Sequence, residues 1–253
     1  MLSALRRAAS IAAPPACGCC ELPLPGGEAV CSSCEVELRA GRPRLGPAPP
    51  GVDLAVAAAD YEGAARKLAH AIKFRRRTGL AALAAELIAR ACPAGELRGT
   101  AVPVPAEPWR RRWRGFDPAE EIALALAGLA ELPYRACLRR ARGPRQVGRR
   151  RSQRLADPPR VSVAAGVPPR VLLVDDVRTT GATLAASAAA LRGQGCLEVV
   201  ALTLARSSHR PRTPPLVAPA RRTYDSATHA GSPTGKENHR EDRRPRQERG
   251  GDR

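Results

Sequence analysis

One stretch, residues 171–184 with the sequence VLLVDDVRTTGATL, constrains the fold of this chain more than any other. Its four apolar residues, Val171 to Val174, predict a short buried strand, and the carboxylates of Asp175 and Asp176 are expected to end it. The small residues from Thr179 to Thr183 then open an Ala-rich segment that should be helical. A buried strand, a turn of small residues and a helix start predict an α/β protein.

The turn after this strand predicts a phosphate site. A helix N-terminus carries unpaired N–H groups and partial positive charge, and threonine hydroxyls there add further donors. Gly181 lets the backbone come close to a ligand. Asp175 and Asp176 would repel a phosphate, but they can accept hydrogen bonds from sugar hydroxyls or hold a magnesium ion. The pattern therefore favours a ribose 5-phosphate ligand, and the simpler alternative is an ordinary parallel strand that ends in an acidic turn.

Four of the eight cysteines form two C-x-x-C pairs near the N-terminus, Cys17 with Cys20 and Cys31 with Cys34. Each pair offers two thiolates from one tight turn, and the short Pro/Gly-rich segment between them can bring both turns onto one tetrahedral zinc ion. We expect a structural zinc site, because the sequence shows no catalytic histidine nearby. Two alternatives stay open, namely Cys19 as a ligand in place of Cys17 and a redox role for the pairs.

The net charge of +18 is concentrated in three places, residues 110–114, residues 135–154 and the C-terminal tail. The second run has no carboxylate, which favours an anionic ligand over a surface that serves only solubility. Solvated arginine-rich faces are the simpler interpretation of the rest. No apolar run is long enough for a membrane span, and the N-terminus lacks the strong apolar core of a signal peptide, so we expect a cytoplasmic protein.

The pattern of elements divides the chain into four parts. Residues 1–40 hold a lead-in and the cysteine module, residues 41–51 form a Pro/Gly-rich linker, and a tail at residues 207–253 is expected to be disordered. The main domain spans residues 52–206. Within it we expect strands at residues 52–59, 101–105 and 197–205, and helices from about residue 63 to 73, 80 to 91 and 117 to 130.

Two segments of the main domain carry further signals. Pro103 and Pro105 stiffen the end of a short strand, so the main-chain groups there should be presented in a fixed orientation. Asp117 and Glu120 predict a capping box at a helix start. In the first helix of the domain, the cations that lie outside the apolar stripe are interpreted as a solvated face or as a binding surface, and they are Arg66, Lys73 and residues 75–77.

Residues 171–184 resemble the PRPP-binding motif of type I phosphoribosyltransferases, in which paired acids precede a TTGAT-like turn. Five blocks together are similar to the ComF family, which includes GntX-like proteins: the paired cysteines, YEGAARKLAHAIKFRRR at 61–77, AVPVPAEPWRRRWRGFDPAEEIALALA at 101–127, RQVGRRRSQRLAD at 145–157, and the 171–184 motif. The resemblance covers about residues 17–206. It implies a type I phosphoribosyltransferase-like parallel sheet flanked by helices, behind a small N-terminal zinc module of four cysteines.

The resemblance also implies roles for individual residues. Asp175 and Asp176 would contact the ribose hydroxyls, Arg114 would belong to an Arg-Gly-Phe element of the site, and residues 146–157 would form a mobile loop. Arg149 and Asp157 differ from the leucine and asparagine that are usual in that loop. The 5-phosphate would be held by Thr179, Thr180, Gly181, Ala182 and Thr183, and the pyrophosphate by Pro103, Val104 and Pro105.

The motif and the resemblance together predict a protein that binds PRPP or a related ribose 5-phosphate with magnesium. The resemblance to the ComF family also implies a role in competence or DNA uptake. As an enzyme it would transfer a phosphoribosyl group and stabilise an oxocarbenium-like ribosyl group, mainly by positioning and charge. The alternative is a non-catalytic protein on the same fold that handles single-stranded DNA or senses PRPP. Trp109 and Trp113 are the obvious aromatic residues in a basic context for DNA stacking. No residue identifies the acceptor.

Overall fold

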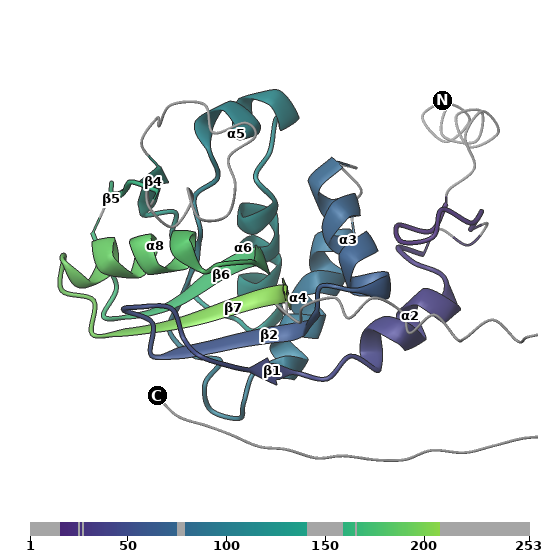
Figure 1. Cartoon of the computed structure of the whole chain (residues 1–253), viewed down its shortest axis with the longest axis horizontal. Helices are drawn as coiled ribbons and strands as arrows, with labels where there is room; N and C mark the ends of the chain where they lie inside the picture. The colour runs from purple at the N-terminus through teal and green to yellow at the C-terminus, as the bar shows by residue number, and fades with distance from the viewer. Residues whose placement is uncertain are drawn as a thin grey trace, which may run out of the picture. The chain divides into compact units, whose positions relative to one another are not determined.

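The chain is described by a computed structural model, which covers residues 16–207 apart from 25, 27, 75–78, 141–158 and 165. A five-stranded sheet with the order β1-β2-β7-β6-β3 forms its centre (Figure 1). Strands β2, β7, β6 and β3 are parallel, and β1 pairs antiparallel with β2 at one edge. The predicted α/β class is confirmed. The strands are β1 (Arg44–Leu45), β2 (Leu54–Asp60), β3 (Thr100–Pro103), β6 (Arg170–Arg178) and β7 (Glu198–Arg206).

Strand β6 contains the predicted apolar run and lies between β3 and β7. Val171 to Val174 are fully buried, as expected for a parallel strand that is covered on both faces. The prediction that the two carboxylates end this strand is wrong, because β6 continues through both acids to Arg178. The partner strand β7 is equally long, so strand pairing continues past the acids, with Asp175 opposite Thr203 and Arg178 opposite Arg206.

Two apolar layers cover the sheet. Helices α3 (Gly63–Phe74), α4 (Leu80–Ala91) and α6 (Pro118–Leu129) pack on the face to which Leu172 and Val174 of β6 belong. Helix α8 (Ala182–Arg192) and a small antiparallel pair, β4 (Leu138–Arg140) with β5 (Val161–Val163), cover the face of Val171 and Leu173 (Figure 1). The expected arrangement of helices on a mostly parallel sheet is therefore confirmed.

The long helices follow the sequence pattern closely. Helix α4 has the predicted bounds, and α6 begins after Asp117, whose carboxylate accepts a hydrogen bond from the backbone N of Ala119. Glu120, which was expected to complete the capping box, instead pairs with Arg111 and accepts a hydrogen bond from the hydroxyl of Tyr134.

Two short helices were not predicted, namely α2 (Ser32–Arg39) and α5 (Pro108–Arg114). Helix α5 has only 7 residues and no buried side chain, so it carries no apolar periodicity that a sequence pattern can reveal. Its limits are nevertheless local: Pro108 occupies the first turn, and Gly115 ends the helix in the left-handed conformation with φ of 77°.

Several predicted segments lie outside the described residues. They are the lead-in at residues 1–15, the loop expected at residues 146–157, which falls in the chain between β4 and β5, and the tail from residue 208 onward. The segment predicted as a linker, residues 41–51, contributes the two-residue edge strand β1. Within the described parts of the chain, no helix has both the length and the apolar character needed to span a membrane.

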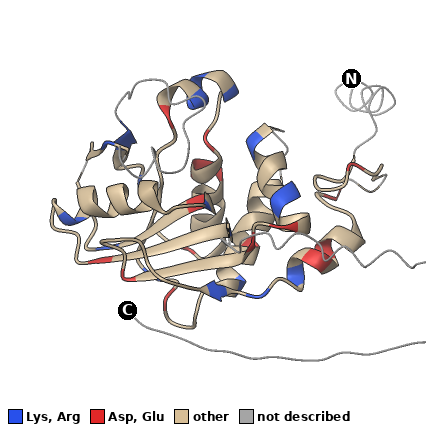
Figure 2. Ribbon diagram, viewed as in Figure 1, with Lys and Arg blue, Asp and Glu red and all other residues tan. Residues whose placement is uncertain are grey.

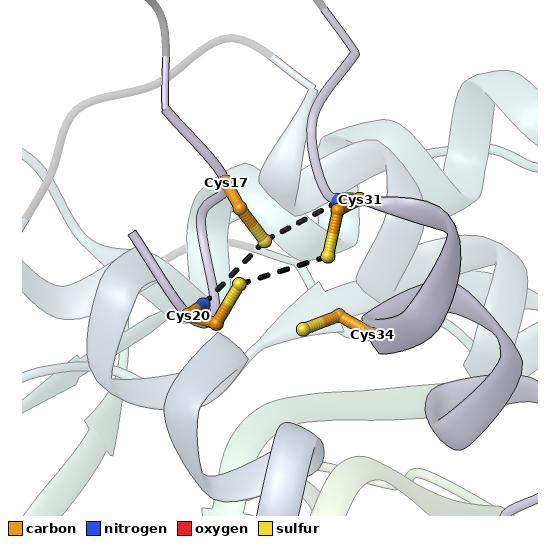
Figure 3. Close-up of side chains that lie close together, drawn as sticks. All are labelled: Cys17, Cys20, Cys31 and Cys34. Carbon is orange, nitrogen blue, oxygen red and sulfur yellow. Dashed lines mark hydrogen bonds between the residues drawn. The ribbon is translucent and has the colours of Figure 1, made fainter. Parts of the chain in front are cut away.

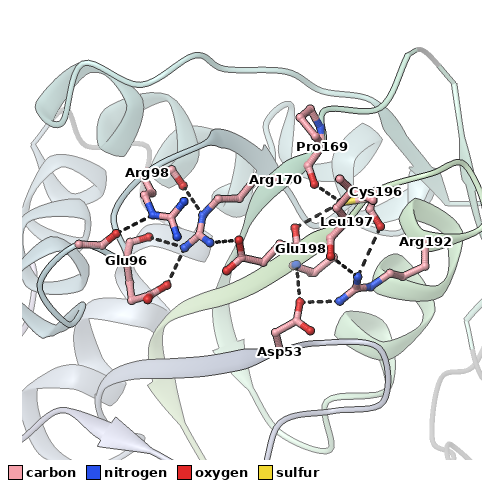
Figure 4. Close-up of polar contacts among 11 residues, drawn as sticks. Asp53, Glu96, Arg98, Pro169, Arg170, Arg192, Cys196, Leu197 and Glu198 are labelled. Carbon is pink, nitrogen blue, oxygen red and sulfur yellow. Dashed lines mark hydrogen bonds and ion pairs between the residues drawn. The ribbon is translucent and has the colours of Figure 1, made fainter.

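Ion pairs tie the amino ends of the central strands together (Figure 4). The guanidinium of Arg170 pairs with the carboxylates of Glu96 and Glu198 and donates a hydrogen bond to the carbonyl oxygen of Arg98 at 3.0 Å. Arg192 pairs with Asp53 beside this cluster. These contacts join the loop before β3 to the starts of β6 and β7, at the end of the sheet opposite to the two carboxylates of β6.

Candidate functional site

A cavity of about 670 Å³ opens at the carboxyl ends of β3 and β6. Ligands of open parallel sheets bind in such crevices, because the loops that follow the strands form the walls. Most of the residues predicted from the sequence line this cavity, although they come from three separate segments of the chain. The predicted residues in its wall are Val104, Pro105, Arg114, Asp175, Asp176, Thr179, Thr180, Ala182 and Thr183.

The acid pair of β6 lies at the base of this cavity. Oδ1 of Asp175 accepts a hydrogen bond from the backbone N of Asp176 at 2.8 Å, and Oδ1 of Asp176 accepts one from the N of Val177, also at 2.8 Å. Successive strand residues start out toward opposite faces, but both carboxylates line this one cavity at the end of the sheet. Asp175 is enclosed by protein and lies beside a second carboxylate, and both effects raise its pKa well above the ordinary value.

The turn between β6 and α8 forms one wall. Gly181 precedes α8 in the left-handed conformation with φ of 76°, and a Cβ there would lie 2.8 Å from Cγ of Pro49, so only glycine fits without strain. Gly181 itself does not line the cavity but shapes the turn. Oγ1 of Thr180 accepts a hydrogen bond from the N of Ala182 at 3.3 Å. Ala182 and Thr183 line the cavity, so the N-terminus of α8 lies at its edge, where it can favour an anion.

A second wall consists of the loop after β3 and the start of α6. Oδ2 of the buried Asp117 accepts a hydrogen bond from the N of Ala106 at 3.0 Å, which ties this loop to the helix start. Burial raises the pKa of Asp117, and its hydrogen bonds to the backbone oppose that effect. Val104 and Pro105 line the cavity, whereas Pro103 is buried within β3, opposite Val174 of β6. Val104 and Pro105 of the predicted pyrophosphate loop therefore face the cavity, and Pro103 does not.

Among the described residues, four cations line the cavity, namely Lys73, Arg110, Arg114 and Arg140. The guanidinium of Arg114 lies 5.0 Å from the ring of Phe74, and its buried Nε has no hydrogen-bond partner among the described residues. Burial, and then the charge of Arg110, lower the pKa of Arg114. Arg140 pairs with Glu107 at 3.0 Å. Figure 2 shows basic residues on α3 and α5, the helices that carry Lys73 and Arg114.

Sequence reasoning did not assign five of the charged lining residues to this site: Lys73, Glu107, Arg110, Asp117 and Arg140. Lys73 was left undecided between a solvated face and a binding surface, and the structure brings its Nζ to 2.7 Å from Oδ2 of Asp176. Its position one residue after the buried Ile72 was a usable signal, because such a residue emerges at the edge of the apolar stripe. No pattern in the sequence indicates the pairing of Glu107 with Arg140.

The second candidate site is the cysteine cluster. The sulfur atoms of Cys17, Cys20, Cys31 and Cys34 all lie within 4.8 Å of one another, and Figure 3 shows their side chains directed toward one centre. Zn–S bonds of about 2.3 Å in a tetrahedron separate the sulfurs by about 3.8 Å. The Sγ atoms of Cys20 and Cys31 are 3.6 Å apart, which is too long for a disulfide. The four thiols therefore fit a metal ion such as zinc.

Backbone amides favour a thiolate at Cys17. The N atoms of Cys19, Cys20 and Cys31 donate to its Sγ at 3.3, 3.4 and 3.3 Å. Burial raises the pKa of Cys17, but these hydrogen bonds outweigh burial and bring it to about 6. The thiol of Cys19, the alternative ligand, donates to the carbonyl oxygen of Ala64 at 3.7 Å, and burial raises its pKa to about 12. The structure groups Cys17, and not Cys19, with the other three cysteines.

Comparisons with other proteins add no family assignment. A scan against models of known protein families and a search of characterised proteins both gave no match to this chain.

Proposed function

We propose that the cavity at the carboxyl ends of β3 and β6 binds PRPP or a related ribose 5-phosphate, and that the chain is a ComF-like member of the type I phosphoribosyltransferases. One observation carries this proposal: the acid pair Asp175 and Asp176 and the N-terminal turn of α8 lie in one cavity with the cation Arg114. A ligand with a phosphate, a diol and a second anionic group matches that set of donors and acceptors. The parallel order of β2, β7, β6 and β3 is consistent with the fold that this family has.

Each part of the ligand has a chemically suitable partner. The turn from Thr179 to Thr183 offers backbone amides and hydroxyls to the 5-phosphate. The carboxylates of Asp175 and Asp176 can accept hydrogen bonds from the 2- and 3-hydroxyls of the ribose. The diphosphate would lie against the loop around Val104 and Pro105, with Arg114 as its cation.

Magnesium enters the proposal as the counter-ion of the diphosphate, and when bound it would supply charge neutralisation to the departing group. Carboxylate oxygens are ligands that this ion prefers, and among the described residues Asp175 faces the cavity without forming an ion pair. Asp175 is therefore the residue that would hold it, directly or through the ribose hydroxyls.

The reaction that this arrangement favours is transfer of the phosphoribosyl group. The bond between C1 of the ribose and the diphosphate breaks, the diphosphate leaves with the electron pair, and a nucleophilic acceptor forms the new bond at C1. The acids hold the ring hydroxyls and oppose the positive charge that develops on the ring, while Arg114 balances the negative charge on the leaving group.

A matched pair of arginine substitutions tests the assignment to this cavity. Arg114 lines the cavity, whereas Arg112 lies exposed on the same helix and does not. In calorimetric titrations of the zinc-loaded protein with PRPP and magnesium, we expect Arg114→Met to weaken binding about ten- to a hundredfold, because it removes a charge-assisted contact. Arg112→Met should bind as the unchanged protein does. Equal effects of the two substitutions, or no binding by the unchanged protein, would contradict the proposal.

Helix α5 favours a second candidate function, the handling of single-stranded DNA. Trp109 and Trp113 expose 45% and 69% of their surface next to Arg110, Arg111 and Arg112. Exposed aromatic rings among cations are typical of surfaces on which bases stack. DNA binding through this helix should weaken steeply as salt rises, and Trp113→Ala should reduce it while leaving PRPP binding unchanged. DNA affinity that is insensitive to both salt and this substitution would exclude the second candidate.

A further inference from the structure

Lys73 makes a direct contact with the acid pair of the cavity. It lies in the last turn of α3, where Leu68 and Ile72 pack the helix against the sheet and leave Lys73 at the edge of the apolar stripe. Its Nζ is 2.7 Å from Oδ2 of Asp176, and its side chain is 23% exposed and lines the cavity. The position of this cation is therefore set by the packing of α3 and by an ion pair with a buried carboxylate.

Phe74, the residue after Lys73 in α3, contacts a second cation, Arg114. The ring of Phe74 lies 5.0 Å from the guanidinium of Arg114. Asp176 belongs to the face of β6 on which α3 and α6 pack, because it continues the alternation of Leu172 and Val174. Lys73 and Arg114 therefore form a pair of cations on the α3 side of the acids, while the turn from Thr179 to Thr183 begins α8 on the other face.

The ion pair with Asp176 leaves N–H donors of the Lys73 ammonium available to a ligand. An ammonium group has three donor positions. Oδ2 of Asp176 has no aligned hydrogen-bond partner among the described residues, so the contact with Lys73 is one of charges and not a well-formed hydrogen bond. A ligand oxygen in the cavity can thus take up donors of Lys73 without the loss of a formed hydrogen bond.

We propose that Lys73 binds the diphosphate of the ligand, and that Asp176 holds Lys73 in position for it in the free protein. This inference rests on the proposed function. A ribose 5-phosphate with a diphosphate at C1 is anionic at both ends, and the amides of α8 can serve only one of them. The opposite end needs a concentrated positive charge, which Lys73 and Arg114 together provide.

The same helix offers a matched control. Lys67 lies in α3 but lines a different, smaller cavity of about 350 Å³ together with Arg66 and His70. The comparison uses Lys73→Met, Lys67→Met and Lys73→Arg, each titrated calorimetrically with three ligands in the presence of magnesium: PRPP, inorganic pyrophosphate and ribose 5-phosphate. Ribose 5-phosphate has the phosphate and the diol but no diphosphate, so it separates a direct contact from a general disturbance of Asp176.

We expect Lys73→Met to weaken PRPP and pyrophosphate binding about ten- to a hundredfold and to change ribose 5-phosphate binding less than about twofold. Lys73→Arg should restore much of the loss, and Lys67→Met should have no effect. A loss of ribose 5-phosphate affinity as large as that of PRPP would overturn the inference, because Lys73 would then act only through Asp176. Unchanged PRPP affinity in Lys73→Met would also overturn it while leaving the proposed function intact. Absence of PRPP binding in the unchanged protein would overturn both.

Discussion

Oδ2 of Asp117 accepts a hydrogen bond from the backbone N of Ala106 at 3.0 Å, so a helix cap also fixes the loop that follows β3. The other carboxylate oxygen of Asp117 caps α6 through the N of Ala119 at 3.1 Å. One buried side chain therefore connects the two segments that form the second wall of the cavity. The rigidity of the loop at Val104 and Pro105 depends on this link as well as on the prolines.

The first prediction concerns this link. Asp117→Ala leaves the amides of Ala106 and Ala119 without their acceptor, and we expect the free energy of unfolding to fall by about 1–3 kcal/mol. Asp117→Asn keeps one acceptor oxygen and should lose less. Denaturant titration of the unchanged protein and the two variants measures these free energies of unfolding. A loss in Asp117→Ala no greater than that in Asp117→Asn would show that the cap does not hold the loop.

The second prediction uses the raised pKa of Asp175. In the unfolded chain an aspartate has a pKa of about 3.9, so the unfolded state releases its proton at a lower pH than the folded state does. The free energy of unfolding therefore falls as the pH rises from about 4 through the raised pKa of Asp175 in the folded state. The stability that the protonated side chain contributes is complete only below the pKa that Asp175 has in the unfolded chain.

Asp175→Asn removes this titration. We expect the variant to be more stable than the unchanged protein at pH 8 and close to it at pH 4, which urea titrations at the two pH values would measure. Glu121→Gln, which changes an exposed acid outside the cavity, serves as the control and should show no such gain. A gain of equal size at both pH values would contradict the assignment to Asp175.

The third prediction concerns the metal. We expect one zinc ion per chain, and we expect Cys17→Ala to abolish its binding while Cys19→Ala retains it, because only Cys17 belongs to the cluster. Elemental analysis of the purified proteins measures this directly. Zinc retained by Cys17→Ala and lost by Cys19→Ala would reverse the ligand assignment.

Removal of the metal should also loosen more than the cysteine module. Cys17, Cys34 and Leu38 belong to the same apolar core as Leu68 of α3 and Leu80 of α4. Since structural zinc contributes binding energy to folding, a chelator should lower the thermal midpoint of the whole described domain. A melting curve that a chelator leaves unchanged would show that the module does not support that core.

The fourth prediction separates stability from binding. Arg170, whose side chain is 10% exposed, joins Glu96 and Glu198 at the amino ends of the strands, far from the cavity. Arg170→Met removes the hydrogen bonds of a buried guanidinium, but the carboxylates that it leaves are 32% and 36% exposed and can be hydrated, so we expect the free energy of unfolding to fall by about 1–3 kcal/mol. PRPP affinity of the folded fraction should not change. A specific loss of ligand affinity at constant stability would contradict the structural role of this cluster.

The sequence predicts local secondary structure well and contacts between distant segments poorly. Helix α4 was predicted with its observed bounds, because its apolar stripe is a local signal. The continuation of β6 past Asp176 was not, because it depends on pairing with the equally long β7. Helix α5 was missed because it has no buried residue to give a period.

The same distinction holds for the sites. The spacing of the cysteines predicted their grouping, since two short turns determine it. The acid pair and the turn after it were recognised because they are contiguous in the chain. The contact between Lys73 and Asp176 joins residues that are about a hundred positions apart, and only the packing of α3 against the sheet creates it. The structure decides between two pairs of alternatives. It groups Cys17, and not Cys19, with the other three cysteines, and it places Lys73 in the cavity wall and not on a purely solvated helix face.

The most direct test of the central claim is calorimetric titration of the zinc-loaded protein with PRPP and magnesium, compared with the double variant Asp175→Asn, Asp176→Asn. A second double variant, Glu86→Gln, Glu121→Gln, removes the same charge outside the cavity and serves as the control. We predict saturable binding by the unchanged protein and the control and none by the acid-pair variant. Equal binding by all three proteins, or no binding by the unchanged one, would contradict a ribose-phosphate site in this cavity.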